Sequence, residues 1–444
     1  MWRRRLPKSL NQNHGEGFVL DLKFIRQNPD AIRAAVIKKH VACDVDRILA
    51  LDEEWRAHTQ VVDELRSKQK SASKAIGKAT PEERVALLEG QQAMKAELKA
   101  EEEKLGAQRR ELDELLLTVP SIPDDDVPEG KDDADNVELR TWGTRREFDF
   151  ELRDHIEIGE AQGWLDIETG ARLAGSRNYV LRGDLSLLEG AVMRFALNLM
   201  VGKGFTAVSV PTLVRREPLE GTGYFPGGED QTYQTDERDD LYLVGTSEVS
   251  VTALHAGETM AHTELPKRYV SLSSCYRREA GTYGKDTKGL YRVHQFLKVE
   301  QVVIDVADEP LSVEHHRAML GYSEELLRLL ELPYRVVNVC GGDLGGPHVQ
   351  KFDIETWMPG RGGYGETHSA SRFYEFQARR LKMRYRDAEG TVRFCHTLNN
   401  TVAASTRMLI AILENHQQAD GTVVIPEPLR PYLDGREVIG KPIS

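Results

Sequence analysis

Two long stretches with a seven-residue apolar repeat, separated by only a few residues, constrain this fold most. The first runs from about Val45 to Gly77, with an apolar seam of Ile48, Leu51, Trp55, Val62, Leu65, Ala72 and Ile76. The second starts at Thr80-Pro81, where Glu83 completes a capping-box pattern, and its seam is Leu87, Met94, Leu98, Leu105, Leu112, Leu115 and Val119. Helices joined by so short a turn must run antiparallel and bury these seams against each other.

The predicted helical pair is a solvated arm rather than part of a thick core, because several seam positions are polar: His58, Gln69, Gln91, Glu101 and Gln108. At about 1.5 Å per residue it would be roughly 50–55 Å long. Its turn end carries residues 66–78, RSKQKSASKAIGK, with five cations and no acid, although the whole chain has a net charge of −12. A solvated helix face, a spacer or dimerisation rod, and a phosphate-binding tip are alternative interpretations of this segment.

The arm is the first of two predicted domains. Residues 1–18 differ in character from the rest of the chain, and we expect a disordered extension or a misassigned start, because VLDLKFIRQNPD from Val19 reads like a natural beginning. The arm domain then covers 19–119. Residues 120–136 hold three prolines and seven acids, which is typical of a linker, and 137–444 form the second domain.

Short apolar runs in the second domain predict strands, and longer amphipathic stretches predict helices. The expected strands are 207–214, 242–251, 268–276, 298–306 and 334–339, and the expected helices are 186–203, 311–332 and 401–417. Because strands outnumber helices without alternating with them, the sequence predicts an α+β fold on an antiparallel sheet.

Several classes of protein are disfavoured. The four cysteines lie far apart without a C-x-x-C pair, which argues against a disulfide framework or a cysteine zinc site and favours a reducing cytoplasm. The sequence has no membrane-length apolar run. It also lacks a G-x-x-x-x-G-K-[ST] loop and a G-x-G-x-x-G after a strand, so any ATP must be held by arginines and metal-bound carboxylates.

Residues 275–300, CYRREAGTYGKDTKGLYRVHQFLKVE, carry the densest chemistry. The pattern predicts a strand, a glycine-rich loop and a return strand. Alternation would place Arg277 and Glu279 on one face, and would place Arg292, Phe296 and Glu300 together on the other strand. Arginine can bridge a carboxylate and a phosphate, an aromatic ring can stack on a base, and glutamate can accept from an amine.

This segment resembles motif 2 of seryl-tRNA synthetases, a class II aminoacyl-tRNA synthetase family. The resemblance extends over nearly the whole chain after Leu20, including G-T-S-E at 245–248, F-Q-A-R-R at 376–380 and a motif 3-like end at 396–415. Pro211 matches the motif 1 proline of the family's dimer interface. The resemblance implies a homodimeric cytoplasmic enzyme that activates L-serine with ATP and loads it onto tRNA(Ser), with tRNA(Sec) as a second substrate.

The resemblance also implies a nucleotide site. Arg277 and Arg407 would be catalytic: Arg277 would bridge the serine carboxylate and the α-phosphate, while Arg407 and Arg292 would hold the γ-phosphate. Phe296 would stack on adenine and Glu279 would meet its amino group. Glu366 and Ser369 would ligate Mg²⁺ with hard oxygen atoms. The implied ATP-binding set is Arg277, Arg278, Glu279, Arg292, Val293, Phe296, Glu366, Thr367, His368, Ser369 and Arg407.

Serine and tRNA sites are implied in the same way. Thr246 and Glu248 would meet the α-amino group, and Glu300 and Thr401 would surround the hydroxyl. The implied serine-binding set is Thr246, Ser247, Glu248, Arg277, Glu300, Asn399 and Thr401. The arm would grip the long variable arm of the tRNA through its cations Arg66, Lys68, Lys70, Lys74 and Lys78.

This chain departs from the family pattern at three places. It has Asn399-Asn400-Thr401 where N-G-S is common, although a hydroxyl is kept, and it has Thr406 where glycine often precedes Arg407. It also differs from E-[IV]-S-S-C-S-N over residues 366–372, and this departure falls on Thr367 and His368. An amino acid–carrier protein ligase and a catalytically inactive paralogue that binds nucleic acid are the alternative functions.

Overall fold

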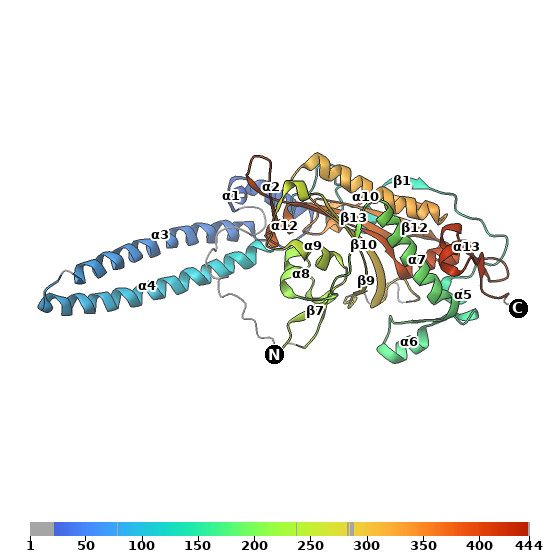
Figure 1. Cartoon of the computed structure of the whole chain (residues 1–444), viewed down its shortest axis with the longest axis horizontal. Coiled ribbons are helices and arrows are strands. Elements are labelled where there is room, and N and C mark those ends of the chain that lie inside the picture. Colours follow the sequence, from blue (N-terminus) through green and yellow to red (C-terminus); the bar gives the residue numbers. More distant parts are fainter. Residues whose placement is uncertain (1–21, 78, 237, 282–283, 285–287, 443–444) are drawn as a thin grey trace. The chain divides into compact units, whose positions relative to one another are not determined.

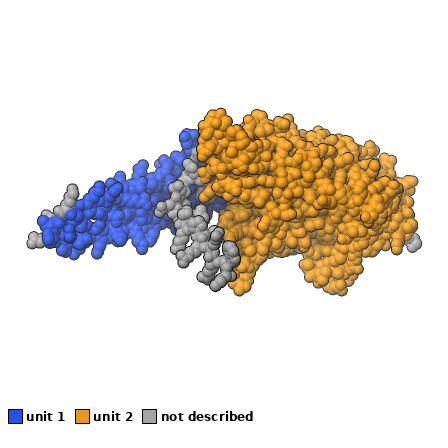
Figure 2. All heavy atoms as spheres, viewed as in Figure 1, with its two compact units in different colours: residues 1–37, 41–120 blue, residues 38–40, 121–444 orange. Residues whose placement is uncertain are grey.

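The protein is described by a computed structural model over residues 22–77, 79–236, 238–281, 284 and 288–442. The predictions for residues 1–18 and Lys78, and the capping role of the Glu83 side chain, lie outside the described residues. The chain divides into two compact units, coloured in Figure 2. Unit 1 contains residues 1–37 and 41–120, and unit 2 contains residues 38–40 and 121–444.

Unit 1 is helical. Its elements are α1 (Leu22–Gln27), α2 (Pro29–Lys38), α3 (Val45–Ile76) and α4 (Pro81–Leu116). The long helices α3 and α4 lie side by side, as the two seams predicted, and α4 begins at the predicted proline (Figure 1). Val62 and Leu65 of α3 pack with Leu98 of α4. At the C-terminal end of α4, Leu116 is buried instead of the predicted Leu115, because a straight helix with 3.6 residues per turn drifts from a seven-residue repeat.

Polar groups on the arm seam bond to one another. His58 contacts Gln108 through Nδ1 at 2.8 Å and Glu101 through Nε2 at 2.7 Å. Nearer the turn, Gln91 donates to the hydroxyl of Ser73 at 2.7 Å. Four of the five predicted polar positions, His58, Gln91, Glu101 and Gln108, therefore find hydrogen-bond partners across the pair, which helps to keep the two helices in register without a continuous apolar core.

Unit 2 is built on an eight-stranded sheet in the order β1-β11-β12-β13-β16-β10-β9-β4. Its strands are β1 (Val137–Trp142), β4 (Thr206–Ala207), β9 (Lys267–Tyr276), β10 (Gln295–Asp305), β11 (Tyr334–Asn338), β12 (Gln350–Met358), β13 (Gly363–Tyr374) and β16 (His396–Ala404). All neighbouring strands are antiparallel except β4 and β9. The predicted α+β class with an antiparallel sheet is confirmed.

Smaller sheets and helices surround this sheet. The helices are α5 (His155–Ala161), α6 (Ile167–Ala174), α7 (Gly183–Gly202), α8 (Arg216–Thr222), α9 (Glu248–Thr252), α10 (Glu309–Leu329), α11 (Gly341–Leu344), α12 (Phe376–Arg380) and α13 (Ser405–His416). The 3₁₀ turns are η1 (Asp133–Asp135), η2 (Glu229–Gln231), η3 (Ala253–His255), η4 (His262–Glu264), η5 (Pro359–Arg361) and η6 (Glu427–Leu433). The short strands are β2 (Leu165–Asp166), β3 (Val180–Leu181), β5 (Leu213–Arg215), β6 (Tyr233–Gln234), β7 (Leu241–Leu243), β8 (Thr259–Ala261), β14 (Arg384–Arg386), β15 (Val392–Phe394), β17 (Val423–Val424) and β18 (Val438–Ile439).

Three predicted elements were wrong in part. The strand expected at 242–251 ends at Leu243, and Glu248–Thr252 form α9, because a short buried apolar run does not distinguish strand from helix. The strand expected at 207–214 is interrupted around Pro211, which cannot donate to a ladder. The helix expected at 401–417 begins at Ser405, because residues up to Ala404 complete the fully buried strand β16.

The segment expected as a linker, 120–136, is bonded into unit 2 from Ser121 onward. The Ser121 N–H donates to the carbonyl of Gly346 at 3.0 Å, and Gln350 donates to the carboxylate of Asp126 at 2.8 Å. Arg372, buried in the sheet, pairs with Asp124. Its acids therefore serve as partners for polar groups of the sheet, which composition alone does not reveal.

The main core of unit 2 lies where α7 and α10 pack on the sheet (Figure 1). Among the described residues, α7 is the one helix long and apolar enough to cross a membrane by length and composition, a test that the core helix of a soluble protein also passes. Its Leu185, Leu188 and Val192 are fully buried in this core. Burial inside unit 2 accounts for the apolar composition of α7.

Candidate active site

The predicted pairing of β9 with β10 forms the platform of the site. In the observed register Phe296 lies opposite Cys275, Lys298 opposite Ser273 and Glu300 opposite Ser271. Beyond the strands, the Arg277 N–H donates to the carbonyl of His294, and His294 Nδ1 donates to the carbonyl of Arg277, both at 2.9 Å. The hairpin base is thereby closed, and Arg277 is held beside the returning strand.

The two faces of β10 have different tasks. Val299 and Val303 point into the main core, where α7 and α10 pack. The alternate residues Phe296, Lys298 and Glu300 share the opposite face. The predicted common face of Phe296 and Glu300 is therefore present, and the buried face behind it fixes the strand. The alternation predicted for the other three residues was wrong, because Arg277 and Glu279 follow the end of β9 and Arg292 precedes β10.

Two β-bulges turn further side chains toward this face. In β16 the register moves from Val299↔Ala403 to Glu300↔Thr401, so Val402 is the extra residue and Thr401 lies beside Glu300. In β13 the register moves from Ile354↔His368 to Glu355↔Glu366, with Thr367 as the extra residue. Glu366 and Ser369 share a face of β13 for this reason, although simple alternation would separate them.

A cavity opens over this face of the sheet. Its lining is Arg277, Glu279, Tyr291, Arg292, Val293, Phe296, Lys298, Glu366, Thr367, Thr401, Ala404, Thr406 and Arg407. Four of these side chains are cationic and two are carboxylates, so the wall carries an excess of positive charge. Such a surface suits a polyphosphate.

The charged groups of the cavity are arranged in pairs. Arg292 contacts Glu279 at 3.0 Å, and Arg407 contacts the Glu366 carboxylate at 3.3 Å. The Arg277 guanidinium lies 5.3 Å from the centre of the Phe296 ring. Glu279 has a left-handed backbone with φ of 52°, an uncommon conformation for a glutamate that marks this turn as functionally constrained.

The surroundings of the Glu366 carboxylate favour its ionised form. Burial by itself would raise the pKa of Glu366, but the cations Arg407, Lys351 and Arg277 outweigh burial and hold the pKa below its ordinary value. With 47% of its side chain exposed, Glu366 also stays open to the cavity. An ionised and accessible carboxylate is what a cation bound to phosphates requires.

The oxygen atoms around Glu366 fit Mg²⁺. Ser369 shares its face, and Asp353, which lies opposite Ser369 in the register, has one buried carboxylate oxygen without a hydrogen-bond partner. Within the described ranges, no group of three or more His, Cys, Asp or Glu side chains could hold a metal by itself. An ion at this place would therefore need ligands from a bound nucleotide as well.

Two buried carboxylates adjoin the cavity and form what we call its buried end: Glu300 contacts the lining residues Lys298 and Thr401, and Glu248 lies close enough to Glu300 to feel its charge. Glu300 is 2% exposed and Glu248 is 4% exposed. Glu248 begins α9, accepts from the Tyr224 hydroxyl at 2.8 Å and accepts from the Gln377 amide at 2.8 Å. Burial and the charge of Glu300 raise the pKa of Glu248 to about 7. An ammonium group bound here would bring a positive charge that stabilises the ionised form of Glu248 against burial and against repulsion by Glu300.

Glu300 has a cationic partner of its own. The Lys298 ammonium lies 2.6 Å from Glu300 Oε2, and the Thr401 hydroxyl donates to the same oxygen at 3.2 Å. Thr246 is buried at the start of α9 and accepts from the Glu248 N–H at 3.2 Å. The buried Ser247 hydroxyl has no hydrogen-bond partner among the described residues.

Most of the predicted site residues converge on this cavity or its buried end, but four do not line it. Arg278 is exposed and bonds through its backbone to Gln231. His368 of β13 is fully buried, and burial lowers its pKa to about 4, so it is a neutral group within the sheet. Ser369 lies on β13 beside the lining, and Asn399 lies further along β16 opposite Val302.

Sequence reasoning missed several residues that shape the site. Lys298 lies within the motif 2-like segment, but a lysine in a strand has no signal that separates it from a surface cation. Tyr224 and Gln377 reach Glu248 from α8 and α12, which are distant in sequence. Tyr291 lies under the Arg407 guanidinium at 4.5 Å. Only the tertiary fold brings these partners together.

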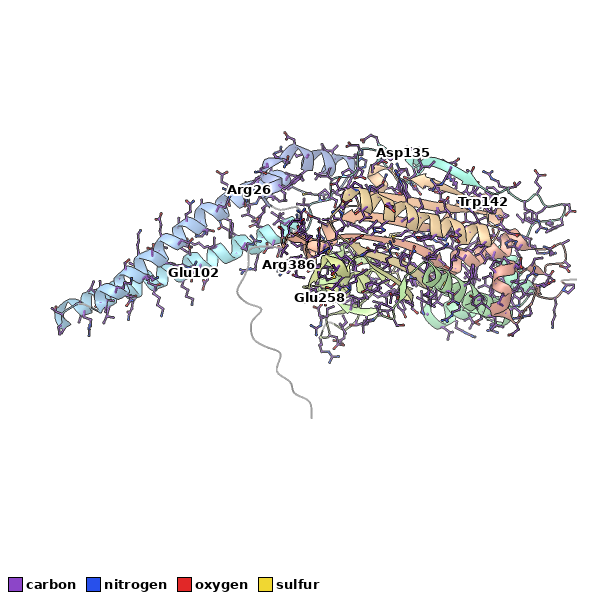
Figure 3. The ribbon with its side chains drawn as sticks, turned by 45° about the horizontal axis from the view of Figure 1, so that its top comes forward. Arg26, Glu102, Asp135, Trp142, Glu258 and Arg386 are labelled. Carbon is purple, nitrogen blue, oxygen red and sulfur yellow. The ribbon has the colours of Figure 1, made fainter. Side chains whose placement is uncertain are left out.

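The predicted arm cations form a separate candidate surface on unit 1. Arg66, Lys68, Lys70 and Lys74 are exposed on α3. Arg66 differs from the lysines because it pairs with Asp63 at 3.2 Å and with Glu102 at 2.9 Å. Glu102 is labelled on α4 in Figure 3. The Arg66 charge is therefore partly neutralised within the arm.

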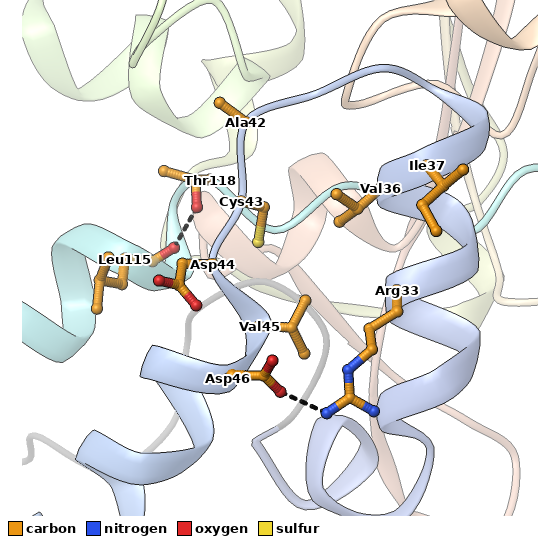
Figure 4. A pocket seen from close by; sticks show the side chains of 10 residues that line it. All are labelled: Arg33, Val36, Ile37, Ala42, Cys43, Asp44, Val45, Asp46, Leu115 and Thr118. Atoms are coloured by element: carbon orange, nitrogen blue, oxygen red, sulfur yellow. Dashed lines mark hydrogen bonds and ion pairs between the residues drawn. The ribbon is translucent and has the colours of Figure 1, made fainter.

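A cavity within unit 1 has a different character. It has a volume of about 610 Å³ and is lined mainly by apolar groups of the α2–α3 connection and the end of α4 (Figure 4). Cys43 faces it, and burial raises the pKa of this thiol, so the sulfur is not an activated nucleophile. All four cysteines are free, as predicted.

The fold and the site together define a class II tRNA synthetase. The family model "tRNA synthetase class II core domain (G, H, P, S and T)" matches residues 232–416, which include β9, β10, β13 and β16. A second model, "Seryl-tRNA synthetase N-terminal domain", matches residues 19–123.

Individual relatives narrow the class further. A serine–tRNA ligase from Deinococcus radiodurans is 49% identical over 96% of this chain and 100% of its own length. The crystal structure of seryl-tRNA synthetase from Pyrococcus horikoshii complexed with ATP has a TM-score of 0.87 at 39% identity, covering 96% of this chain and 100% of that one. The serine–tRNA ligase from Naegleria fowleri in complex with AMP has a TM-score of 0.83 at 31% identity, with coverages of 96% and 99%. The chain belongs to the seryl-tRNA synthetase family, and the predicted enzyme class, a serine–tRNA ligase, is confirmed.

Proposed function

We propose that the cavity over β10 and β13 forms seryl-adenylate from ATP and L-serine, and that the enzyme then transfers serine to tRNA. The observation that carries this proposal is one cavity lined by Arg277, Arg407 and Glu366, with the two buried carboxylates at its end. In the first step a serine carboxylate oxygen attacks the α-phosphorus, and the bond to pyrophosphate breaks. In the second step a ribose hydroxyl at the tRNA 3′ end attacks the acyl carbon, AMP leaves and the hydroxyl proton is released.

Neither substrate needs a protein base for adenylate formation, because the serine carboxylate is already ionised. Catalysis is then alignment and charge neutralisation. Arg277 lies at the closed base of the hairpin and would bridge the carboxylate and the α-phosphate. Arg292 and Arg407 would exchange their present acidic partners for the γ-phosphate. Phe296 would stack on adenine, and Glu279 would accept from its amino group.

Glu366 and Ser369 would hold Mg²⁺ beside the phosphates, where the ion would neutralise charge on the leaving pyrophosphate. The same-face position of the two residues, created by the bulge at Thr367, supports this assignment. The relatives complexed with ATP and AMP support a nucleotide in the corresponding cavity.

Serine would be recognised at the buried end of the cavity. Glu248, with Thr246 and Ser247 beside it, would receive the ammonium group, and Glu300 and Thr401 would receive the hydroxyl. A site whose buried groups require a hydroxyl leaves them unpaired with alanine, a penalty that can reach on the order of 10⁴-fold. Glu300 and Thr401, the two groups that would meet the hydroxyl, are both buried, which supports such discrimination.

The helical arm would bind the variable arm of tRNA(Ser), and of tRNA(Sec) where the cell contains it. Exposed Lys68, Lys70 and Lys74 on one end of α3 support this role. Arg66 would contribute less, since Glu102 and Asp63 already hold its guanidinium.

The active form would be a homodimer in the cytoplasm. Strand β4 is the end strand of the eight-stranded sheet, and the following segment, residues 208–213, alternates between half-buried and exposed residues, with Pro211 exposed. An open edge of this kind can be covered by a second copy. Light scattering of the purified protein should give twice the chain mass of 50.1 kDa. The four free thiols suit the reducing cytoplasm.

Amino-acid-dependent ATP–pyrophosphate exchange tests the proposed function, with serine, threonine, alanine and glycine measured in parallel. We expect exchange with serine and loss of exchange in Arg277→Ala, while tRNA charging requires the arm. Exchange with a different amino acid and transfer to a carrier protein would indicate a carrier ligase. Absence of exchange with any amino acid would indicate an inactive paralogue.

A further inference from the structure

Lys298 is a buried ammonium group that the proposed reaction does not yet use. Its side chain extends from β10 toward the cavity and is 6% exposed. The ammonium lies 2.6 Å from Glu300 Oε2 and 3.4 Å from the Thr401 hydroxyl, which itself donates to the same Glu300 oxygen at 3.2 Å. Lysine is rarely buried to this degree unless it is paired, so its position calls for a specific reason.

The second buried carboxylate has a different environment. Glu248 accepts hydrogen bonds from two neutral groups, the Tyr224 hydroxyl and the Gln377 amide, both at 2.8 Å. Neither partner compensates a negative charge. The two acids thus differ in their ion pairs: Lys298 is in direct contact with Glu300, whereas none of the described residues forms an ion pair with Glu248, and the Lys298 charge acts on Glu248 only through space.

This difference matters because serine presents two polar groups to the two acids. Its ammonium group is cationic and its side-chain hydroxyl is neutral. In a buried site an ammonium gains most from an uncompensated carboxylate, and it is repelled by a neighbouring cation. A neutral hydroxyl loses little binding energy beside a lysine, because it can still donate a hydrogen bond to a carboxylate that is already paired.

We propose that Lys298 is a specificity-determining residue, which reserves Glu300 for a neutral hydroxyl donor and leaves Glu248 as the acceptor for the substrate ammonium group. This inference rests on the proposed serine site. Lys298 would thereby fix the orientation of the amino acid and exclude substrates with a cationic side chain of serine's size. Thr401, held by the same Glu300 oxygen, would define the room left for the hydroxyl.

The inference predicts a change in substrate choice when the cation is removed. In Lys298→Met, Glu300 would lack its cation and could accept an ammonium group. The probe is L-2,3-diaminopropionate, the serine analogue with an amino group in place of the hydroxyl, at a pH below the pKa of both amino groups. Serine at the same pH is the reference. We expect kcat/KM for serine to fall roughly 100-fold, and the ratio of analogue to serine to rise by at least about 100-fold.

Three further variants make the experiment specific. Lys298→Arg keeps the charge and should keep the preference for serine. The double variant Lys298→Met with Glu300→Gln should lose the gain toward the analogue, because no uncompensated carboxylate remains. Lys203→Met is a matched control, since Lys203, which directly follows α7, forms a similarly short ion pair with Glu325 of α10, at 2.7 Å, and does not line the cavity. It should leave the ratio unchanged.

The outcomes separate this inference from the proposed function. If the unmodified enzyme lacks serine-dependent exchange, the proposed function fails. If the enzyme is active and Lys298→Met raises KM for ATP without changing the ratio, Lys298 is a nucleotide contact and the inference is wrong. If Lys298→Met does not fold, Lys298→Gln is measured in its place with the same two criteria. Failure of both to fold would assign Lys298 to sheet stability and would also overturn the inference.

Discussion

The raised pKa of Glu248 predicts that serine use depends on pH in the neutral range. Burial and the charge of Glu300 raise this pKa to about 7, so the free enzyme holds a proton on Glu248 below neutrality. The substrate ammonium needs the ionised carboxylate. Lowering the pH through about 7 therefore weakens serine binding, because the proton must be released before the ammonium can be accepted.

The size of the effect can be worked out from that value. With a pKa of about 7, about nine-tenths of Glu248 is ionised at about pH 8 and about one-tenth at about pH 6. The value of kcat/KM for serine should fall about tenfold between these conditions, which corresponds to ~1.3 kcal/mol. Free serine remains a zwitterion over this range, so the change belongs to the enzyme.

The assay is ATP–pyrophosphate exchange at limiting serine across this pH range. The internal control is kcat/KM for ATP at saturating serine, which should vary much less. Tyr224→Phe removes a hydrogen bond that lowers the pKa of Glu248, so the midpoint of the serine profile should move to higher pH. A serine profile that is flat between about pH 6 and about pH 8, or one that the ATP profile follows, would refute the reasoning.

The remaining predictions concern stability, the arm and the loop return. The folded state holds the Glu248 proton up to about pH 7, so the wild type should lose stability as pH rises from the ordinary carboxyl pKa to that value. Glu248→Gln should lack this part of the loss, which is at most about 3 kcal/mol of unfolding free energy, while other buried groups such as Asp353 keep their own contribution. Alanine at the three exposed arm lysines, Lys68, Lys70 and Lys74, should lower kcat/KM for tRNA roughly tenfold or more and leave ATP–pyrophosphate exchange unchanged. Arg66→Ala should lower kcat/KM for tRNA less, because Glu102 already pairs with Arg66. Equal loss of tRNA charging and of exchange would refute the arm assignment. Gly289→Ala should lower exchange at least about tenfold, because its Cβ would lie 2.1 Å from His155 Nε2 at a φ of +69°. Gly281→Ala, at a φ of +76° and with none of the described atoms within 4 Å of the added Cβ, should show backbone strain alone, and equal loss in both variants would contradict this steric explanation.

The sequence predicted the arm well because its repeat is long and its start carries a strong local signal. A seam of two helices requires only local periodicity, and the proline at Pro81 fixes where α4 begins. The repeat predicted Leu115 in the buried seam, but Leu116 is buried there, because the period of a straight helix drifts away from seven residues.

The site was predictable as a set of residue types but only partly as a geometry. Alternation correctly placed Phe296 and Glu300 on one face of β10. It could not place Thr401 or Glu366, because each depends on a bulge that adds one residue to a strand. The partners of Glu248 come from α8 and α12, and only the packed sheet brings them to it.

A crystal structure with a non-hydrolysable seryl-adenylate analogue would test the proposed active site most directly. We expect adenine on Phe296, the ammonium group within hydrogen-bond distance of Glu248, and the hydroxyl within hydrogen-bond distance of Glu300 and Thr401. An analogue bound outside the cavity lined by Arg277 and Arg407, or one whose ammonium group contacts Glu300 beside Lys298, would contradict this assignment.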